Sequence, residues 1–425
     1  MTNPELLQLL RSEVIPAIGC TEPIAVALCT ARAKELLGAE PDSITVHMSK
    51  NVYKNALAVG IPNTGMTGLP IAIALGATVG RSEYMLEVLR DATPEAVAYA
   101  KAYMLRVPAT IKVDYEAPSL LYIHVEVSSN GQTAQATIMD EHTHFVEPGT
   151  RKQESISIGE IETKENTLSL RRVYDFAASV DTTELTFLLA GAEMNTAAAE
   201  TSFADQYGHG LGRLLRANTL TATPKMEKLF GNTLFTKIIS YTCGACDARM
   251  SGAMVQVISN SGSGNQGISC SIPVYLYAKE NNCTEEQTLR ALALSNLTVI
   301  YIKQSLGRLS ALCGCVVAAT GSAAGITYLM GGTYDEITYA IKNMIANISG
   351  MICDGAKPGC ALKVTSGVAT AIFSAYLAMQ HSYADSTEGI VEDDIDRTIR
   401  NLTRIGHDGM KVTDDLILDI MTHKQ

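Results

Sequence analysis

The sequence has no tryptophan and little charge, and each shortage limits what the protein can do. Tryptophan, a residue typical of membrane interfaces, is absent from all 425 residues. Charged residues make up 18% of the chain, against roughly 25% in an average soluble domain. We therefore expect a large buried fraction and a homo-oligomer. The formal net charge of −11 disfavours binding to nucleic acid or to anionic lipid.

The composition also argues against a disordered chain and against a secreted one. Hydrophobic residues make up 47%, enough apolar surface to offset the entropy of ordering the chain. The opening residues, MTNPELLQLL, lack the basic start and the apolar stretch of an export signal. The ten cysteines therefore indicate a reducing compartment, where thiols act as ligands or as reactive groups. We expect a cytoplasmic protein.

Two long uncharged stretches raise the question of a membrane span. Residues 309–334 carry no charge over more than the ~20 residues that a spanning helix needs. They consist largely of Gly, Ala, Ser, Thr and Cys, and residues 364–380 are similar. This composition favours close helix contact in a protein interior. We expect buried central helices and no membrane association.

Hydrophobic spacing divides the chain into two lobes. The fold we expect is an α/β (α+β) lobe of mixed sheet and helices at 41–160, joined to a mainly α-helical catalytic lobe formed by 1–40 and 161–425, with the boundary at 151–166. A hairpin turn is expected at 129–131 (SNG), and Thr21 is the expected N-cap of the second helix. The expected elements are helices over 4–15, 21–37, 66–78 and 82–106, and strands over 43–48, 109–115, 120–128 and 132–140.

Cysteines at two distant places are the most unusual feature. Cys313 and Cys315 flank one glycine, and Cys353 and Cys360 bracket a turn of composition DGAKPG. Three thiolates can hold a cubane cluster with one iron left open, and an open iron can act as a Lewis acid. The alternative is that these are buried thiols in small-residue helices. The CxxC at 243–246 has no second ligand pair at zinc-ribbon spacing, and we leave it unassigned.

Three other segments carry polar groups that suit chemistry. The loop at 259–267 (SNSGSGNQG) contains GxGxxG, which fits a dinucleotide site only within a βαβ unit; its N–H groups can also cradle a carboxylate. Cys20, at a helix start, can have its thiol pKa lowered by the helix dipole and act as a base or nucleophile, or it can be a packed thiol. His142 and His144 would share one face of a strand, as metal ligands or as solvated histidines.

Several short strings spread over nearly the whole chain form one pattern. They are 19–23 (GCTEP), 50–51 (KN), 59–62 (VGIP), 261–267 (SGSGNQG), 353–360 (CDGAKPGC), and 409–410 (GM) ahead of 413–414 (TD). With these strings the sequence resembles the L-cysteine desulfidase family, which is related to the iron–sulfur L-serine dehydratase alpha chain. The resemblance implies β-elimination from a small amino-acid substrate, converting L-cysteine to pyruvate, ammonia and sulfide.

The resemblance also implies an oxygen-sensitive [4Fe–4S] cluster. By matching position, Cys313, Cys353 and Cys360 would hold it, with Cys315 as a second candidate beside Cys313. Cys20 matches the cysteine proposed as the base in the family, and we add Glu22 to the catalytic set. The predicted substrate contacts are Asn51, His144, Arg249, Ser261, Gly262, Ser263, Gly264 and Asn265. An L-serine dehydratase-type deaminase and a non-enzymatic metal or redox sensor remain alternatives.

Overall fold

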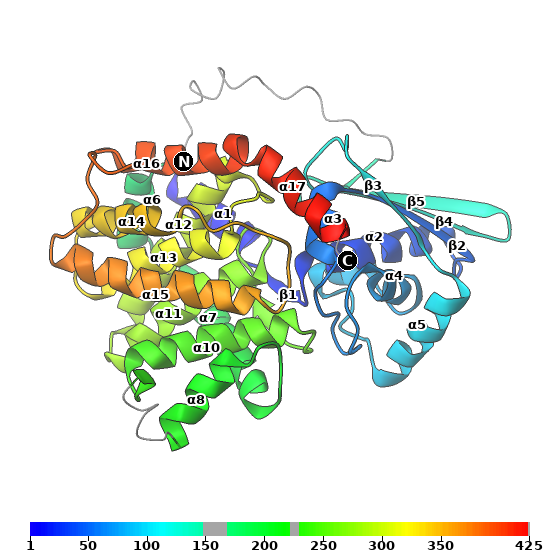
Figure 1. The fold of residues 1–425 in the computed structure, drawn as a ribbon, viewed down its shortest axis with the longest axis horizontal. Coiled ribbons are helices and arrows are strands. Elements are labelled where there is room, and N and C mark those ends of the chain that lie inside the picture. Colours follow the sequence, from blue (N-terminus) through cyan, green and yellow to red (C-terminus); the bar gives the residue numbers. More distant parts are fainter. Residues whose placement is uncertain (148–167, 222–228, 424–425) are drawn as a thin grey trace.

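The computed structural model describes residues 1–147, 168–221 and 229–423. The predicted lobe boundary at 151–166 lies outside these residues. Figure 1 shows a sheet with its helices at one end of the molecule and a larger helical body at the other. This two-part layout confirms the expected α+β fold class. The division of the chain at 41 and 160 stays a prediction.

The sheet is mixed and five-stranded, in the order β3-β2-β4-β5-β6. Strands β2 and β3 are parallel, and the other neighbours are antiparallel. The hairpin between β4 and β5 turns at Asn130 and Gly131, both with positive φ (50° and 79°), as the sequence predicts. The strands are β2 (Ser43–Ser49), β3 (Thr110–Asp114), β4 (Tyr122–Ser129), β5 (Gln132–Met139) and β6 (Phe145–Val146).

One face of this sheet is buried because apolar residues alternate along its strands. In β2 the side chains of Ile44, Val46 and Met48 point into the core, whereas Thr45 and His47 lie on the other face. Helices cover the apolar face (Figure 1). They are α2 (Thr21–Leu37), α3 (Lys50–Ala56), α4 (Leu69–Thr78) and α5 (Pro94–Arg106). Helix α2 therefore packs with the sheet, although the predicted helical lobe includes residues 1–40.

The helical body is built around α13 (Gly314–Leu329), which is almost entirely buried. Its small residues allow close approach: a Cβ at Gly325 would lie 3.0 Å from the carbonyl oxygen of Ala291 in α12. This matches the expectation for 309–334. Around it lie α1 (Asn3–Glu13), α6 (Leu170–Ser179), α7 (Thr186–Ala204), α8 (Leu211–Thr221), α10 (Leu234–Met250), α11 (Gly264–Glu280), α12 (Glu285–Leu306), α14 (Tyr334–Ile348), α15 (Cys360–Met379) and α16 (Ile395–Arg404).

Two further elements link the halves. Strands β1 (Pro16–Ile18) and β7 (Gln256–Ile258) form a small antiparallel sheet. The last helix, α17 (Lys411–Thr422), leaves the helical body and packs against α3 beside the sheet (Figure 1). Residues from both halves therefore meet at one junction.

Two local predictions are wrong. Residues 82–106 do not form one helix: a short 3-10 helix, η1 (Ser82–Glu87), comes first, and α5 begins only at Pro94 after the capping residue Thr93. Proline favours the first turn of a helix because it has no N–H to satisfy there. The N-cap of α2 is Cys20 rather than Thr21. The end of that helix at Gly38 (φ 73°) is as expected.

Among the described helices, α15 alone is long and apolar enough to cross a membrane by length and composition. Half of its most apolar stretch (50%) is buried against the rest of the protein. Its outward side carries Phe373 and Tyr376, which are more than half exposed. The absence of membrane association and the homo-oligomeric state stay predictions.

Candidate active site

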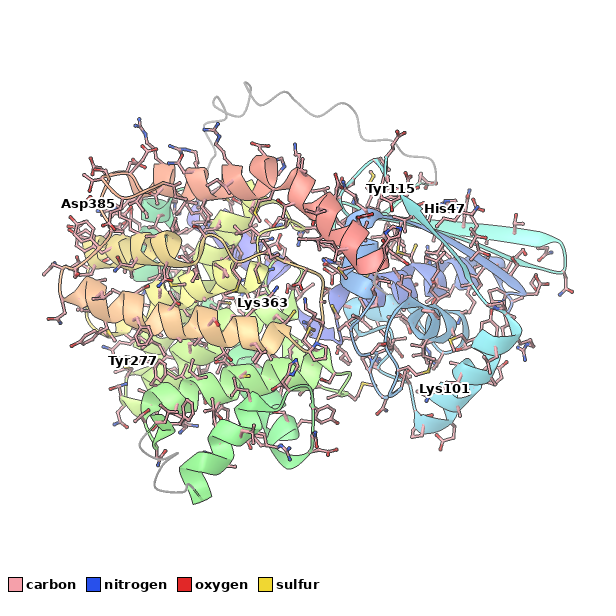
Figure 2. The ribbon with its side chains drawn as sticks, in the orientation of Figure 1. His47, Lys101, Tyr115, Tyr277, Lys363 and Asp385 are labelled. Carbon is pink, nitrogen blue, oxygen red and sulfur yellow. The ribbon has the colours of Figure 1, made fainter. Side chains whose placement is uncertain are left out.

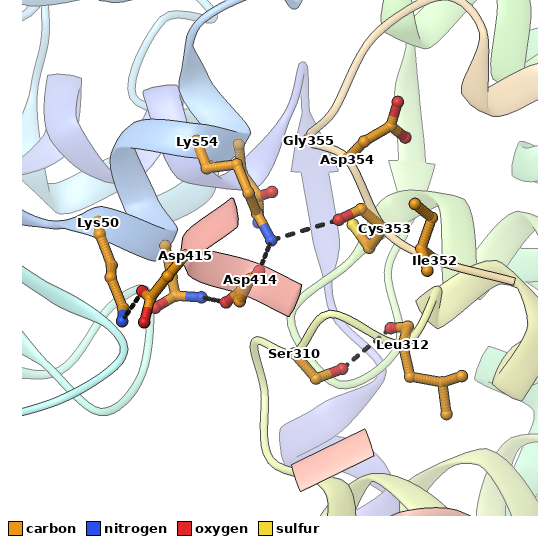
Figure 3. A network of polar contacts seen from close by, with 12 residues as sticks. Lys50, Lys54, Ser310, Leu312, Ile352, Cys353, Asp354, Gly355, Asp414 and Asp415 are labelled. Atoms are coloured by element: carbon orange, nitrogen blue, oxygen red, sulfur yellow. Dashed lines mark hydrogen bonds and ion pairs between the residues drawn. The ribbon is translucent and has the colours of Figure 1, made fainter. Parts of the chain in front are cut away.

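Two backbone segments bring Cys313 and Cys353 together. The Cys313 N–H donates to the carbonyl of Met351 (2.9 Å), and the Cys353 N–H donates to the carbonyl of Ala311 (2.7 Å). These bonds flank a β-bridge between Leu312 and Ile352, and Figure 3 shows these two residues side by side. Two cysteines 40 positions apart in sequence are thus held on adjacent strands of chain.

Cys360 joins the same neighbourhood as the first residue of α15. Its sulfur lies 3.8 Å from the carbonyl oxygen of Gly355 in the turn that follows Cys353. Burial raises the pKa of the Cys360 thiol to about 11, and negative charge on Cys353 and Cys313 adds to the increase. The turn between Cys353 and Cys360 and the bridge between Leu312 and Ile352 therefore place the three cysteines in one neighbourhood.

Cys315 also interacts with Cys313. The Cys315 thiol is the main cause of a lowered Cys313 pKa, at about 6, and its own pKa is raised in turn. Of the two candidates, Cys313 is the one that this contact favours as a thiolate, the form that binds metal.

The chemistry of the donors suits a cluster, because thiolates are the ligands that a cubane takes, one to each iron. Within the described residues, no three His, Cys, Asp or Glu side chains converge as a metal site would require. Lysines surround the thiols, as suits an anionic group. Lys303 is buried, and Lys363 of α15 donates to the carbonyl of Ile352; Figure 2 shows Lys363 toward the middle of the molecule.

Lys303 is the least expected of these cations. It is only 6% exposed and donates to the carbonyl of Arg308 (3.0 Å), and no carboxylate of the described chain lies within ion-pair distance of it. Burial lowers the pKa of Lys303 to about 8, and negative charge on Cys353 and Cys313 opposes this decrease. No sequence pattern points to this residue, because a lysine in an apolar helix is usually exposed.

The glycine-rich loop, residues 259–265, joins β7 to α11 on one side of these thiols. Ser263 caps α11, and Asn260 and Ser263 exchange backbone hydrogen bonds (3.1 and 3.0 Å). Gln266, at the start of α11, packs against Gly314, between the two cysteines of the 313–315 segment. In the described chain β7 pairs with β1 alone and antiparallel, so no βαβ unit supports the dinucleotide interpretation.

Arg249 lies beneath this loop without a counter-ion. Its side chain is 1% exposed, and one terminal nitrogen donates to Asn265 Oδ1 (2.9 Å). The Nε and the other terminal nitrogen have no hydrogen-bond partner, and no carboxylate in the described residues lies within 4.0 Å. Gly264 packs directly against it, so a Cβ there would collide with Nε. A buried guanidinium without a partner is costly, which suits a site that receives an anion.

Glu22 is the centre of a second group of polar side chains. Its carboxylate accepts hydrogen bonds from Cys20 Sγ (3.2 Å), Thr21 Oγ1 (3.1 Å) and Asn55 Nδ2 (3.2 Å). His142 Nε2 lies 3.8 Å from Glu22 Oε1, an ion-pair distance too long for a hydrogen bond. Burial alone would raise the pKa of Glu22, but interaction with His142 and Cys20 outweighs it and holds the pKa at about 2.

Of the two alternatives for Cys20, this arrangement favours the packed thiol, and its catalytic role stays a prediction. Burial raises the pKa of its thiol well above the ordinary value, and the charge of Glu22 raises it further. The dipole of α2 does not offset these effects, so in this protein without substrate the group is a thiol that donates to Glu22.

The predicted substrate contacts divide into two groups. Arg249 and the loop residues 261–265 lie together, with Ser261 held at a positive φ of 48°. Two other predicted residues are engaged elsewhere. Asn51 donates to Asp414 of α17, and the ring of His144 bonds the carbonyl of Met139 (3.2 Å).

His142, rather than His144, reaches the loop. It is 5% exposed, and a Cβ at Gly262 would lie 2.7 Å from its Nδ1. The sequence pointed to both histidines as a metal pair or as solvated side chains and to His144 as a substrate contact, but it gave His142 no such contact. Within the described chain, no group of three or more His, Cys, Asp or Glu side chains that could hold a metal ion is formed.

Asp414 completes a closed contact between α17 and α3. Its carboxylate accepts hydrogen bonds from Asn51 Nδ2 and Lys54 Nζ. Lys54 also donates to the carbonyl of Cys353 (3.4 Å), and Figure 3 shows Lys54 between Asp414 and Cys353. The cysteines of the CxxC string, Cys243 and Cys246, are buried on α10 and unpaired by disulfide.

A pocket of about 570 Å³ opens beside the turn that carries Cys360. Its lining includes His209, Met250, Ser251, Lys357 and Gly359. It therefore lies between the cysteine turn and the end of α10, the helix that carries Arg249.

Comparison with known proteins gives consistent matches along the chain. A family model described as the serine dehydratase alpha chain matches residues 83–419. The chain is 56% identical to a UPF0597 protein of Phocaeicola vulgatus, covering 99% of this chain and 98% of that protein. A UPF0597 protein of Porphyromonas gingivalis is 47% identical, covering 100% and 99%. One of Oleidesulfovibrio alaskensis is 42% identical over the full length of both (100%).

Proposed function

Because this chain belongs to the serine dehydratase alpha chain family, we propose that it is an iron–sulfur-dependent lyase that eliminates the β-substituent of a small amino acid. The substrate we propose is L-cysteine, which would yield pyruvate, ammonia and sulfide. The observation that supports this most is Arg249: a buried, uncompensated guanidinium beside a glycine-rich loop suits the carboxylate of an amino acid.

Three thiols and their surroundings support the cofactor. Cys313, Cys353 and Cys360 would hold a [4Fe–4S] cluster, since the bridge between Leu312 and Ile352 and the turn after Cys353 bring them into one neighbourhood. Two buried or half-buried lysines, Lys303 and Lys363, stand nearby. When bound through three cysteines, such a cluster supplies one open iron that acts as a Lewis acid.

The protein's own groups would bind and orient the substrate. The guanidinium of Arg249 and the N–H groups at the start of α11 would hold the carboxylate, because both present positive charge to an anion. The closed packing around Glu22 would exclude water from the reacting carbon, which strengthens these interactions. Fixing the substrate next to charged groups lowers the barrier to removing a proton beside a carboxylate.

An L-serine dehydratase is the second candidate, because the matching family model carries that description. Serine and cysteine differ only in the leaving atom, so both would use the same carboxylate contacts. The cytoplasmic location, the homo-oligomeric state and a small-molecule substrate as the only partner are further predictions.

Anaerobic reconstitution followed by product assays tests the proposal. Pyruvate and sulfide are measured with L-cysteine, and pyruvate with L-serine, for the wild type, Cys353→Ala and the control Cys283→Ala, which alters a cysteine outside the site. We expect sulfide and pyruvate from L-cysteine, lost only in Cys353→Ala. Pyruvate from L-serine alone would favour the dehydratase, and cluster absorbance without any product would favour the sensor.

A further inference from the structure

We propose that His142, aligned by the carboxylate of Glu22, accepts the α-proton of the substrate. The inference rests on the lyase function proposed above and assigns a residue to its central proton transfer. Glu22 is a positioning residue in this account, and Cys20 supports Glu22 rather than acting as the base.

The surroundings of His142 are the first reason. The side chain is 5% exposed, yet neither ring nitrogen has a hydrogen-bond partner in the described structure. Buried polar atoms are nearly always satisfied, so an imidazole with two open nitrogens suits a ligand that arrives later. Nδ1 faces Gly262 of the loop that lies next to Arg249, and Nε2 faces Glu22.

Glu22 is built to stay ionised and fixed. Three donors, from Cys20, Thr21 and Asn55, hold its two oxygens in place. A pKa of about 2 keeps the carboxylate charged at any physiological pH. A fixed carboxylate beside an imidazole selects the tautomer with the proton on the near nitrogen and stabilises the imidazolium that forms. In His142 the proton would therefore lie on Nε2, next to Glu22, and Nδ1, which faces the loop, would be free to accept a proton.

Arg308 lies on the same side of Gly262 as His142: a Cβ at Gly262 would lie 3.2 Å from a terminal nitrogen of Arg308 and 2.7 Å from Nδ1 of His142. The guanidinium forms ion pairs with Glu13 (2.8 Å) and Glu141 (3.2 Å), so its charge is compensated by these carboxylates. Cys20, the alternative base, would have to lose a proton next to the charged Glu22.

The step balances without any added oxidant or reductant. Nδ1 of His142 takes the α-proton, and the electron pair of the C–H bond forms the double bond between Cα and Cβ. The Cβ–S bond breaks, and hydrosulfide leaves with its electron pair. The 2-aminoacrylate that remains tautomerises to the imine and is hydrolysed to pyruvate and ammonium, while His142 returns its proton to solvent.

Kinetics of the anaerobically reconstituted full chain test the assignment. His142→Asn should lower kcat for sulfide release by at least ~100-fold with iron content unchanged. Glu22→Gln should lower kcat, and Glu22→Asp should restore part of it. Cys20→Ser, which keeps a hydroxyl donor to Glu22, should lose less than about tenfold, and the control His47→Asn on β2 should stay within about threefold. With substrate deuterated at Cα, the isotope effect should increase in Glu22→Gln, because proton transfer becomes slower.

The outcomes separate the two proposals. If the wild type forms product and His142→Asn keeps wild-type kcat, or if Cys20→Ser loses more than His142→Asn, the assignment of His142 is wrong and the lyase stands. If the wild type forms no product from any β-substituted amino acid, both proposals fail.

A second measurement does not depend on activity. Heteronuclear NMR of labelled histidine rings in the cluster-free full chain, assigned with His142→Asn, reports which nitrogen carries the proton. The proposal requires the proton on Nε2 in the neutral ring, with both tautomers populated in Glu22→Gln. A proton on Nδ1 in the wild type would overturn the alignment by Glu22.

Discussion

Two buried cations on opposite sides of the junction are treated differently by the fold. Lys54 of α3 is 2% exposed and is paired with Asp414 of α17. Arg249 of α10 is 1% exposed, and the only hydrogen bond of its side chain in the described structure is to the amide of Asn265. The first cation is neutralised by the chain itself, whereas the second has no negative charge beside it.

This difference separates a structural contact from a binding site. A buried charge without a partner destabilises the folded state, so selection against it is expected unless a ligand supplies the missing charge. The pair between Lys54 and Asp414 fixes the last helix against the sheet half. Arg249 lies beneath a glycine-rich loop without a counter-ion, and an amino-acid carboxylate bound there would supply the missing negative charge.

Arg249→Met should give the largest effect on activity. The variant loses the charged contact to the substrate carboxylate, so kcat/KM should fall roughly 10³-fold, about 4 kcal/mol. The free energy of unfolding should not fall, because the variant removes an uncompensated buried charge. Steady-state kinetics and urea denaturation check both points, with the exposed Arg171→Met as control. An Arg249→Met variant that is less stable but fully active would contradict the distinction between a structural contact at Lys54 and a binding site at Arg249.

Asp414→Asn should affect stability instead. It leaves the ammonium of Lys54 buried without its counter-ion, at a cost of about 3 kcal/mol in the free energy of unfolding. The double variant Lys54→Met with Asp414→Leu removes both charges and should recover most of the loss. Urea denaturation of both variants measures this. If Asp414→Asn cost less than about 1 kcal/mol in the free energy of unfolding, the pair between Lys54 and Asp414 would not be what fixes α17 against α3.

Asp247, two residues before Arg249, should make stability depend on pH. Burial raises the pKa of Asp247 to about 6, although the hydrogen bond from the backbone N–H of His209 favours the ionised form and opposes this increase. The folded protein therefore binds this proton more tightly than the unfolded chain does. Stability from this group is greatest below its ordinary pKa of 3.8 and is lost as the pH rises to about 6, on the order of 2 kcal/mol. Urea denaturation at a series of pH values in this range should show the free energy of unfolding falling with pH in the wild type and changing less in Asp247→Asn. The same dependence on pH in both proteins would contradict this prediction.

Gly38→Ala should give the smallest effect, at the end of α2 opposite to Cys20. Its φ of 73° strains a residue with a Cβ, but nothing lies within 4 Å of that atom. We expect a loss of about 1 kcal/mol in the free energy of unfolding and no change in kcat/KM. A change in activity would mean that the two ends of α2 are coupled.

Much of the fold is predictable because its signals are local. Alternation in β2, the turn at Asn130 and Gly131, and the small-residue composition of α13 each predict the element that forms. The single helix expected over 82–106 fails because Met85 adopts a positive φ of 49° and Pro94 starts a new helix. Runs of helix-forming residues do not reveal such breaks.

The site is less predictable, because its contacts are between distant segments. The resemblance indicated Cys313, Cys353 and Cys360, and the loop and Arg249 do lie together. The state of the Cys20 thiol depends on burial and on Glu22, which no local pattern reveals. The role of His142 depends on Glu22, 120 residues earlier in the sequence, and the pKa of Lys303 depends on burial and on Cys353, 50 residues later.

The most direct test of the account is the iron in anaerobically purified protein, counted chemically and examined by Mössbauer spectroscopy before and after L-cysteine is added. We expect about four irons per chain, one of which changes its signal when L-cysteine binds. Protein that holds no iron under these conditions, or a cluster whose irons are all unaffected by L-cysteine, would contradict the account.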